Sequence, residues 1–211
     1  MEKFIIEVDN IPSEDLTTKT FQELKESYPK QVYISFGSIK EISEKYERRL
    51  RDNNFFNDPK STEFDGIDMF DNRVEFKYCT VKKGKKWQQV KPRCCDYFIL
   101  FDVNGGEVDV YFIYPHQISS KSGKENKEDG KLMLQRQHRG NLHEGQVSKN
   151  DEFLKLATHM GTYEFDISNL LSKDDVLTII DNIRVKLTND RIKKHTISRN
   201  KQNTPTRKTQ Q

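Results

Sequence analysis

Residues 64–80 hold acidic side chains and a lysine within one short stretch whose pattern predicts a β-hairpin. Apolar residues alternate with Glu75 and Lys77, so these two side chains are expected on one exposed strand face, roughly 7 Å apart. At that separation a carboxylate can bind a divalent cation while the ammonium contacts the same phosphate. With an upstream aspartate, the pair predicts an oxygen-rich metal site suited to phosphate chemistry.

Two aspartates are candidates for the upstream ligand. A tight turn at residues 71–72, where Asp-Asn carries turn chemistry, places Asp68 opposite Glu75. A wider loop centred near Phe70 places Asp65 opposite Glu75 instead. Turn chemistry favours the first arrangement, and the hairpin pattern alone leaves the second open.

Asp65, nine intervening residues and an ExK tripeptide from Glu75 to Lys77 resemble the D…(D/E)xK signature of the PD-(D/E)xK nuclease superfamily. The compact spacing is most similar to that of type II restriction endonucleases, although Phe64 stands where the family often has proline. In that family the Asp and Glu bind Mg²⁺, and the lysine orients or helps to deprotonate the attacking water. The resemblance therefore favours Asp65 as the metal ligand and leaves Asp68 to hydrogen-bond the turn or contact solvent.

The sequence after the hairpin extends this resemblance. Residues 87–92, WQQVKP, are similar to a W-x-x-[IV]-x-P segment of many restriction enzymes, and residues 96–103, DYFILFDV, to the buried strand that follows it. Residues 108–114 form a second apolar run, and both runs predict central strands. The resemblance covers residues 64–114 and implies a restriction-endonuclease-like α/β core, with a central mixed β-sheet flanked by helices on both faces.

The resemblance also implies an activity: Mg²⁺-dependent, sequence-specific hydrolysis of phosphodiester bonds in double-stranded DNA by a homodimeric endonuclease. Asp65 and Glu75 would hold the metal against the phosphate, and Lys77 would supply positive charge beside the attacking oxygen. Two alternatives stay open. One is another nuclease of the same fold, such as a junction resolvase or a repair endonuclease. The other is a non-catalytic DNA-binding protein that keeps the scaffold.

Composition limits the class of protein. Of the 211 residues, 33% are hydrophobic and 33% charged, and the mean hydropathy is -0.90, so the apolar residues must be concentrated in a few elements. No apolar run approaches the length of a membrane span and no signal peptide is recognisable, so a cytoplasmic protein without a membrane partner is expected. Cys79, Cys94 and Cys95 lack the CxxC spacing of a zinc site and are expected as free thiols.

One nuclease domain is expected over residues 1–188. Its parts are a metal-site core at about 38–114, a recognition segment at about 116–150 and a helical part at 151–188. The recognition segment holds few apolar residues and is expected as a long loop. Residues 189–211 are basic and lack apolar periodicity, which predicts a disordered tail that helps to hold nucleic acid.

Two amphipathic helices are predicted before and after the central strands. A capping pattern and an apolar stripe predict the first over residues 38–50, and Glu41 or Glu44 on it is a candidate for an additional acid at the metal site. The second, over residues 172–187, has an apolar stripe that would cover the sheet or a partner subunit. Shorter elements are predicted at 4–8 (strand), 13–29 (helix) and 151–160 (helix).

Two segments carry side chains suited to DNA. The basic turn after the hairpin is expected to contact phosphates, because each lysine that meets the backbone releases a counterion. These phosphate-binding candidates are Lys83, Lys85 and Lys86. The recognition segment carries side chains that pair with base edges, as arginine does with guanine and glutamine or asparagine with adenine. These base-reading candidates are Arg136, Gln137, Arg139 and Asn141. His138 and His143 lie beside them, but their spacing fits no metal-finger pattern.

Overall fold

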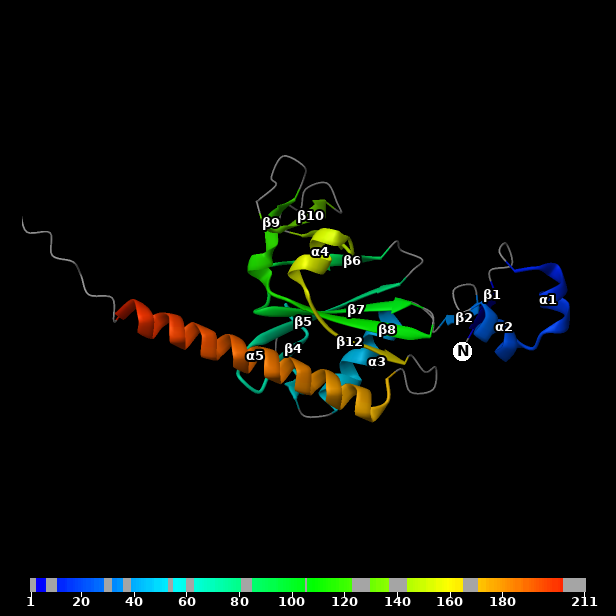
Figure 1. The fold of residues 1–211 in the computed structure, drawn as a ribbon, viewed down its shortest axis with the longest axis horizontal. Helices are drawn as coiled ribbons and strands as arrows, with labels where there is room; N and C mark the ends of the chain where they lie inside the picture. The colour runs from blue at the N-terminus through cyan, green and yellow to red at the C-terminus, as the bar shows by residue number, and fades with distance from the viewer. Residues whose placement is uncertain are drawn as a thin grey trace, which may run out of the picture.

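The computed structural model describes most of the 211-residue chain. The described residues are 3–6, 11–28, 32–35, 39–52, 55–59, 63–80, 85–104, 106–122, 130–136, 144–164 and 171–202. At the centre lies a six-stranded mixed sheet with strand order β12-β8-β7-β5-β4-β3 (Figure 1). Its strands are β3 (Phe56–Asn57), β4 (Gly66–Asp68), β5 (Arg73–Thr80), β7 (Tyr97–Asn104), β8 (Glu107–Ile113) and β12 (Thr158–Glu164). β5 and β7 run parallel and the other neighbouring strands antiparallel, so the predicted mixed α/β architecture is confirmed.

The middle strands of this main sheet are covered on both faces. β7 has a neighbouring strand on each edge, and its first seven residues are buried. A strand with two covered faces has a continuous apolar sequence in place of an alternating one. The prediction of central strands at residues 97–103 and 108–114 is therefore confirmed, within a residue at each end.

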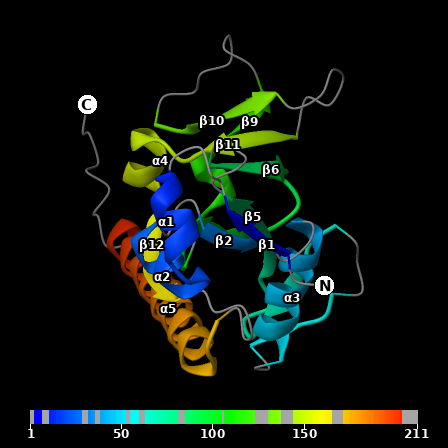
Figure 2. The ribbon, with the colours of Figure 1, turned by 90° about the vertical axis from the view of Figure 1, so that its right-hand side faces the viewer.

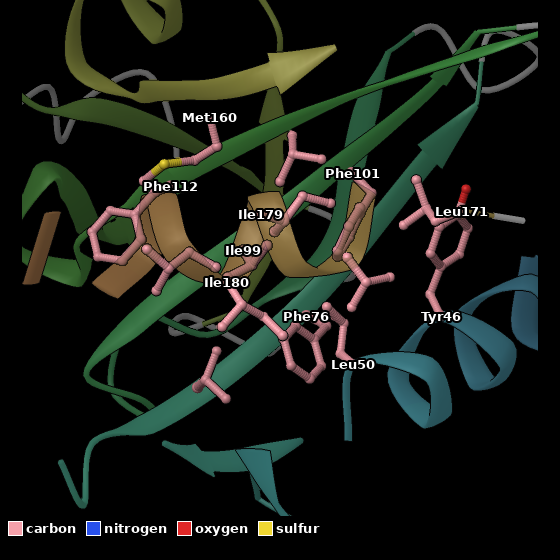
Figure 3. Packing of buried hydrophobic residues seen from close by; sticks show 14 of the residues in the cluster. Tyr46, Leu50, Phe76, Ile99, Phe101, Phe112, Met160, Leu171, Ile179 and Ile180 are labelled. Atoms are coloured by element: carbon pink, nitrogen blue, oxygen red, sulfur yellow. The ribbon is translucent and has the colours of Figure 1, made fainter. Parts of the chain in front are cut away.

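Two helices cover one face of the main sheet. They are α3 (Ile39–Arg51) and α5 (Lys173–Gln202). Figure 3 shows the core between helices and sheet, in which α3 contributes Tyr46 and Leu50, and α5 contributes Ile179 and Ile180. Phe101 of β7 stacks on Tyr46, with ring centroids 5.2 Å apart. The predicted apolar stripes of both helices are thus the surfaces that close this side of the sheet.

α5 begins with a capping box and extends farther than predicted. The Asp175 backbone N–H donates to Ser172 Oγ, and the Ser172 N–H donates to the Asp175 carboxylate, both at 3.1 Å. The helix continues to Gln202, so the prediction of a disordered tail is wrong for residues 189–202. The prediction relied on apolar periodicity, which this segment lacks. Its lysines and arginines are good helix formers without such a stripe, and the prediction did not take this propensity into account. No helix in the described stretches is both long enough and apolar enough to cross a membrane.

A second, four-stranded sheet and a short helix cover the opposite face, where helices alone were expected. They are β6 (Lys86–Val90), β9 (Ile118–Ser122), β10 (Leu132–Arg136) and β11 (Gly145–Ser148), in the sheet order β6-β11-β10-β9, and α4 (Asp151–Leu156). Trp87 fills the space between the sheets: its Nε1 donates to the Phe101 carbonyl at 3.0 Å, and its ring lies 4.8 Å from that of Phe153. Figure 2 shows the order of the layers, with the second sheet at the top, the main sheet in the middle and α3 and α5 below.

The second sheet corrects the prediction of a long loop at residues 116–150. A 3₁₀ turn, η3 (Pro115–Gln117), leads into β9, and β10 and β11 follow in the described part of this segment. Ile118, Leu132, Leu134 and Val147 are buried against the main sheet. These few apolar residues are enough for short strands, because Trp87 and Phe153 supply much of the apolar volume from neighbouring elements.

Two further elements differ from their predictions. The helix predicted at 151–160 ends as α4 at Leu156, and the chain turns into β12, which pairs with the edge of β8. The N-terminal region has two helices in place of one, because Thr20 and Glu23 form a capping box that starts the second. Its elements are β1 (Lys3–Ile6), α1 (Ser13–Thr18), α2 (Phe21–Ser27) and β2 (Val32–Ser35). They lie to one side of the main sheet, where Ile11 and Leu24 form a small separate cluster (Figure 1).

Candidate functional site

The β4–β5 hairpin has the wider of the two turns considered from the sequence. Gly66 pairs with Val74 across the two strands. The same register, extended by one residue, sets Asp65 opposite Glu75, and the loop between the strands is centred on Phe70. The structure thus brings together the two carboxylates of the expected signature.

Asp68, the other candidate, is part of the turn. Its side chain is 1% exposed, and Oδ1 accepts the backbone N–H groups of Phe70 at 2.8 Å and Asn72 at 2.9 Å. Oδ2 accepts the Asn72 side-chain amide at 2.9 Å and the Tyr97 hydroxyl at 3.0 Å. Both oxygens are therefore occupied by the hydrogen bonds that shape the turn. This arrangement matches the expectation that Asp68 hydrogen-bonds the turn.

Asp65, Glu75 and Lys77 form one cluster beside the start of β4. Asp65 directly precedes this strand, and the other two residues lie on β5. Asp65 Oδ2 accepts the backbone N–H of Phe76 at 2.8 Å, which fixes this carboxylate beside β5. Lys77 Nζ forms a salt bridge with Glu75 Oε1. The expectation of an exposed strand face is wrong, since the Glu75 residue is only 6% exposed. The second sheet and the residues that follow it cover this face of β5, which a local alternation pattern cannot reveal.

Glu75 carries a polar atom with an unmet hydrogen-bonding need. Among the described residues, Glu75 Oε2 is one of a few buried side-chain oxygens without a hydrogen-bond partner. Burial raises the pKa of Glu75, although Lys77 opposes the rise. Burial alone would lower the pKa of Lys77, but the adjacent Glu75 carboxylate outweighs it and the pKa is raised. Lys77 is therefore an ammonium at neutral pH, and Glu75 Oε2 is a buried oxygen that no described protein group pairs with.

A third carboxylate reaches the cluster from α3. Burial, followed by the repulsion of Asp65, raises the pKa of Glu47 to about 7. Arg51 Nη2 partly offsets this charge by contacting Glu47 Oε2 at 3.1 Å. The sequence had suggested Glu41 or Glu44 for an acid from this helix; the Glu41 side chain lies outside the described part of the structure, and Glu44 is exposed. Sequence reasoning missed Glu47, which directly follows the buried Tyr46, and this position at the border of the apolar stripe was the available signal.

The DNA-contact candidates are placed only in part. Lys85 is exposed and Lys86 begins β6, while Lys83, Gln137, Arg139 and Asn141, like His138 and His143, lie outside the described residues. The backbone of Arg136 ends β10 and pairs with Gly145 of β11, which in turn pairs with Val90 of β6. Lys91, the next residue, is among the cations that lower the pKa of Glu75, and its Nζ lies 3.8 Å from Glu144. The strand ends that flank residues 137–143 therefore lie at the candidate-site end of the second sheet.

Asp65 and Glu75 are the oxygen donors that the candidate site offers to a Mg²⁺ ion. No group of three or more His, Cys, Asp or Glu side chains within the described ranges is arranged to hold a metal ion. Mg²⁺, however, is usually bound by one or two carboxylates, with waters and substrate phosphate completing its octahedron. Asp65 and Glu75 supply two carboxylates from neighbouring strands, and Glu75 Oε2 is a buried oxygen without a partner in the described part of the chain. These residues fit the cation.

The sequence is matched neither by a protein-family model nor by a curated protein. The three cysteines are free thiols, as expected, and so supply no disulfide framework that would point to another class. The function is therefore inferred from the side chains that the hairpin and α3 bring together.

Proposed function

We propose that this protein is a Mg²⁺-dependent endonuclease that hydrolyses phosphodiester bonds of double-stranded DNA. The observation that carries the proposal is Glu75: a buried carboxylate with one oxygen paired to Lys77 and the other without a partner among the described residues, directly across from Asp65. An unsatisfied buried charge is costly and is retained in proteins chiefly where a ligand completes it. A divalent cation is the ligand that two facing carboxylates suit best.

Each side chain has a separate role in this proposal. Asp65 and Glu75 bind the cation, and the Asp65 orientation is fixed in advance by the Phe76 backbone N–H. Mg²⁺, when bound, acidifies a coordinated water and offsets charge on the phosphate. Lys77 is protonated because Glu75 raises its pKa, so it orients the attacking oxygen and stabilises negative charge by donating hydrogen bonds. It does not act as the base.

Glu47 adds a third negative charge, which shapes the metal-free site. Three carboxylates near one another repel, and with a pKa of about 7 Glu47 holds a proton for a large part of the time at neutral pH. That proton lowers the repulsion toward Asp65. A cation at the site would take over this role and release the proton, as metal binding commonly does.

The finer assignments are also proposals. The order of α3, the β4–β5 hairpin, the parallel strand β7 and β8 is compatible with a restriction-endonuclease-like core. We propose a type II restriction enzyme in which Arg136, Gln137, Arg139 and Asn141 contact base edges and Lys83, Lys85 and Lys86 contact phosphates. Residues 137–143 connect β10 to β11, and Gly145 at the start of β11 pairs with Val90, the neighbour of Lys91. Lys91 lowers the pKa of Glu75, so this connection begins and ends near the candidate site, which supports the proposal. A homodimer is proposed because cutting both strands at a two-fold symmetric site needs two active centres.

Plasmid cleavage tests the proposal directly. Purified protein with Mg²⁺ should convert supercoiled plasmid to nicked and linear forms, and EDTA should stop the reaction. Asp65→Asn should remove cleavage but keep DNA binding, because it deletes a ligand charge and a source of repulsion toward phosphate. Asp71→Asn is the matched control: it makes the same chemical change on the same hairpin, at an exposed position with a φ of 63° that asparagine tolerates. Normal binding without cleavage by the wild type would support a non-catalytic DNA-binding protein.

Mapping the ends of the products separates the remaining alternatives. A fully sequenced phage DNA should give discrete fragments whose ends share one short sequence if the enzyme is a restriction endonuclease. Cleavage confined to branched or damaged duplexes would indicate a junction resolvase or a repair endonuclease of the same fold. If Arg136 and Arg139 read bases, replacing either with alanine should weaken specific binding more than random binding, by about 1 to 3 kcal/mol.

A further inference from the structure

The C-terminal part of α5 extends beyond the body of the protein. Among the α5 side chains that the structure describes, which end at residue 197, Leu187 is the last one buried against the core, and residues 191–197 are all exposed. Figure 1 shows this end of the helix continuing past the main sheet without a neighbouring element. We call residues 191–202 the α5 arm. Helix that protrudes without core contacts needs another reason to be kept.

The direction of the arm is fixed at its base. Tyr114 of the loop after β8 donates its hydroxyl to Asp190 Oδ2 at 2.6 Å, and Lys186 Nζ lies 3.1 Å from the same oxygen. Arg191 places its guanidinium 4.1 Å from the centre of the Phe70 ring, at the tip of the β4–β5 hairpin. Phe70 is five residues from Glu75. The arm therefore leaves the body next to the turn of the hairpin that carries the candidate site.

The arm is basic throughout. Its Lys and Arg residues are Arg191, Lys193, Lys194, Arg199 and Lys201, and no acidic residue occurs from residue 191 to the end of the chain. Cations at the C-terminal end of a helix also interact favourably with the helix dipole, so the charge helps the arm to stay helical. A surface with many cations and no anions is complementary to a polyanion.

A second copy of the chain fits the arm less well. Val185 and Ile192 are exposed apolar residues seven positions apart, as in a coiled-coil seam. The next position of that series is Arg199, and the positions between its members hold polar residues, Thr188 or Asn189 and His195 or Thr196. A single heptad does not hold two helices together.

We propose that the α5 arm binds the phosphate backbone of duplex nucleic acid that flanks the candidate site. Its 12 residues span ~18 Å, which is the length of about five base pairs. Binding through Lys193 and Lys194 is electrostatic and independent of sequence. The placement of the duplex at the candidate site rests on the proposed nuclease function, whereas phosphate binding by the arm does not.

The test compares two double substitutions that remove the same charge from the same helix. Lys193→Gln/Lys194→Gln alters the arm, and Lys173→Gln/Arg184→Gln alters exposed cations on the part of α5 that packs on the body. Each protein binds a fluorescein-labelled duplex of about 30 base pairs in EDTA, followed by anisotropy at several salt concentrations. The binding constant K falls as salt rises, and each lost phosphate contact should make the slope of log K against log salt less steep by ~0.9. In the arm variant the steepness should therefore fall by about 2, and binding at low salt should be about tenfold weaker. The control variant should match the wild type.

Several outcomes overturn the proposal. The first three concern duplex binding: the arm variant keeps the wild-type affinity and salt dependence, both variants lose the same affinity, or the wild type does not bind the duplex. The fourth is a halved solution mass of the arm variant, which would make the arm a contact between subunits. Plasmid cleavage measured in parallel keeps the two proposals apart. If duplex binding depends on the arm but no cleavage occurs, the proposal for the arm is supported and the proposed nuclease function is contradicted. If the wild type cleaves and the arm variant binds as the wild type does, the nuclease function is supported and the proposal for the arm is contradicted.

Discussion

Two buried charge clusters lie on the same face of the main sheet, about 13 Å apart along β7, and they differ in how fully their oxygens are satisfied. One is the candidate site with Glu75 and Lys77. In the other, Lys149 Nζ contacts Asp102 and also Asp109, the latter at 2.9 Å; we call these three residues the Lys149 clip. Both clusters pair a lysine with carboxylates between the two sheets. Their chemistry is alike, and only their surroundings differ.

In the Lys149 clip every carboxylate oxygen has a partner. Asp102 Oδ1 accepts the Cys79 thiol at 3.4 Å, and Oδ2 accepts Lys149. Asp109 Oδ1 accepts the Thr162 hydroxyl at 2.6 Å, and Oδ2 accepts Lys149. Burial alone would raise the pKa of Asp109, but the hydrogen bonds from Thr162 and Lys149 outweigh it and the pKa is lowered. At the candidate site burial prevails instead, and the pKa values of Glu75 and Glu47 are raised.

The difference separates a structural cluster from a candidate binding site. A buried charge with all its hydrogen bonds made is stable as it stands, and removing one partner is costly. A buried carboxylate with a free oxygen is destabilising until something binds it. The Lys149 clip joins the loop after β11 to β7 and β8, so it holds the second sheet on the main one. At the candidate site Glu75 Oε2 makes no such contact with the described residues, which leaves this oxygen available for a ligand.

The largest expected effect is the separation of activity from stability at Glu75. Glu75→Gln should lower plasmid cleavage by roughly 10²- to 10³-fold, because it removes a ligand for the cation. The melting temperature should change little, since the easier burial of a neutral side chain is offset by the loss of the counter-charge of Lys77. Calorimetry and a cleavage time course measure the two effects. A variant that melts far below the wild type, or cuts at the wild-type rate, would contradict the assignment.

The Lys149 clip should behave in the opposite way. Lys149→Met leaves Asp102 buried without its cation and should cost about 3 kcal/mol of folding free energy, or roughly 6 to 12 °C in melting temperature. Cleavage measured below the transition should stay near the wild-type rate per folded molecule. Lys155→Met is a suitable control, because Lys155 is an exposed lysine on nearby α4. Loss of activity in a folded Lys149 variant would show that the clip is more than structural.

The contrast between the clusters also explains what the sequence could predict. The apolar runs at 97–103 and 108–114 and the helical stripes are local patterns, and the structure has them where they were expected. The pairing of Asp65 with Glu75 depended on loop width, and the family spacing indicated the correct register. The Lys149 clip joins residues 40 and 47 positions apart, and such contacts leave no local pattern.

Burial of the candidate site could not be predicted for the same reason. The face that carries Glu75 is covered by β6 and by strands from residues 118–148, whose apolar residues are too few to show a clear period. The position of Glu47 depends on how α3 docks on the sheet, which spacing along one helix does not determine. Helix in residues 189–202 was missed because this part of the sequence carries no apolar stripe, and its side chains from 191 to 197 are exposed.

Asp68→Asn sharpens the comparison within the hairpin. Asp68 resembles the clip aspartates, since both of its oxygens are occupied. Asparagine keeps the oxygen that accepts the Phe70 and Asn72 backbone amides but loses the one that accepts the Asn72 side-chain amide and the Tyr97 hydroxyl. We expect a loss of about 1 to 2 kcal/mol in unfolding free energy and retention of most cleavage activity. Urea unfolding and plasmid assays measure both, and a folded but inactive Asp68→Asn beside an active Asp65→Asn would transfer the metal-binding role to Asp68.

The last expected effect is a pH dependence of stability that belongs to Glu47. Its pKa is raised in the folded protein from the ordinary value of 4.5 to about 7, so folding favours the protonated form. The stabilisation is complete below the unfolded pKa and is lost as pH rises through the folded value, between about 4.5 and 7. Metal-free wild type should therefore lose stability across this window, and Glu47→Gln should lose less, because its amide cannot ionise. Glu44→Gln, an exposed position one turn earlier on α3, is the control and should follow the wild type. Urea midpoints in EDTA at several pH values measure the difference, and parallel profiles for wild type and Glu47→Gln would show that Glu47 is not held in the repulsive field of Asp65.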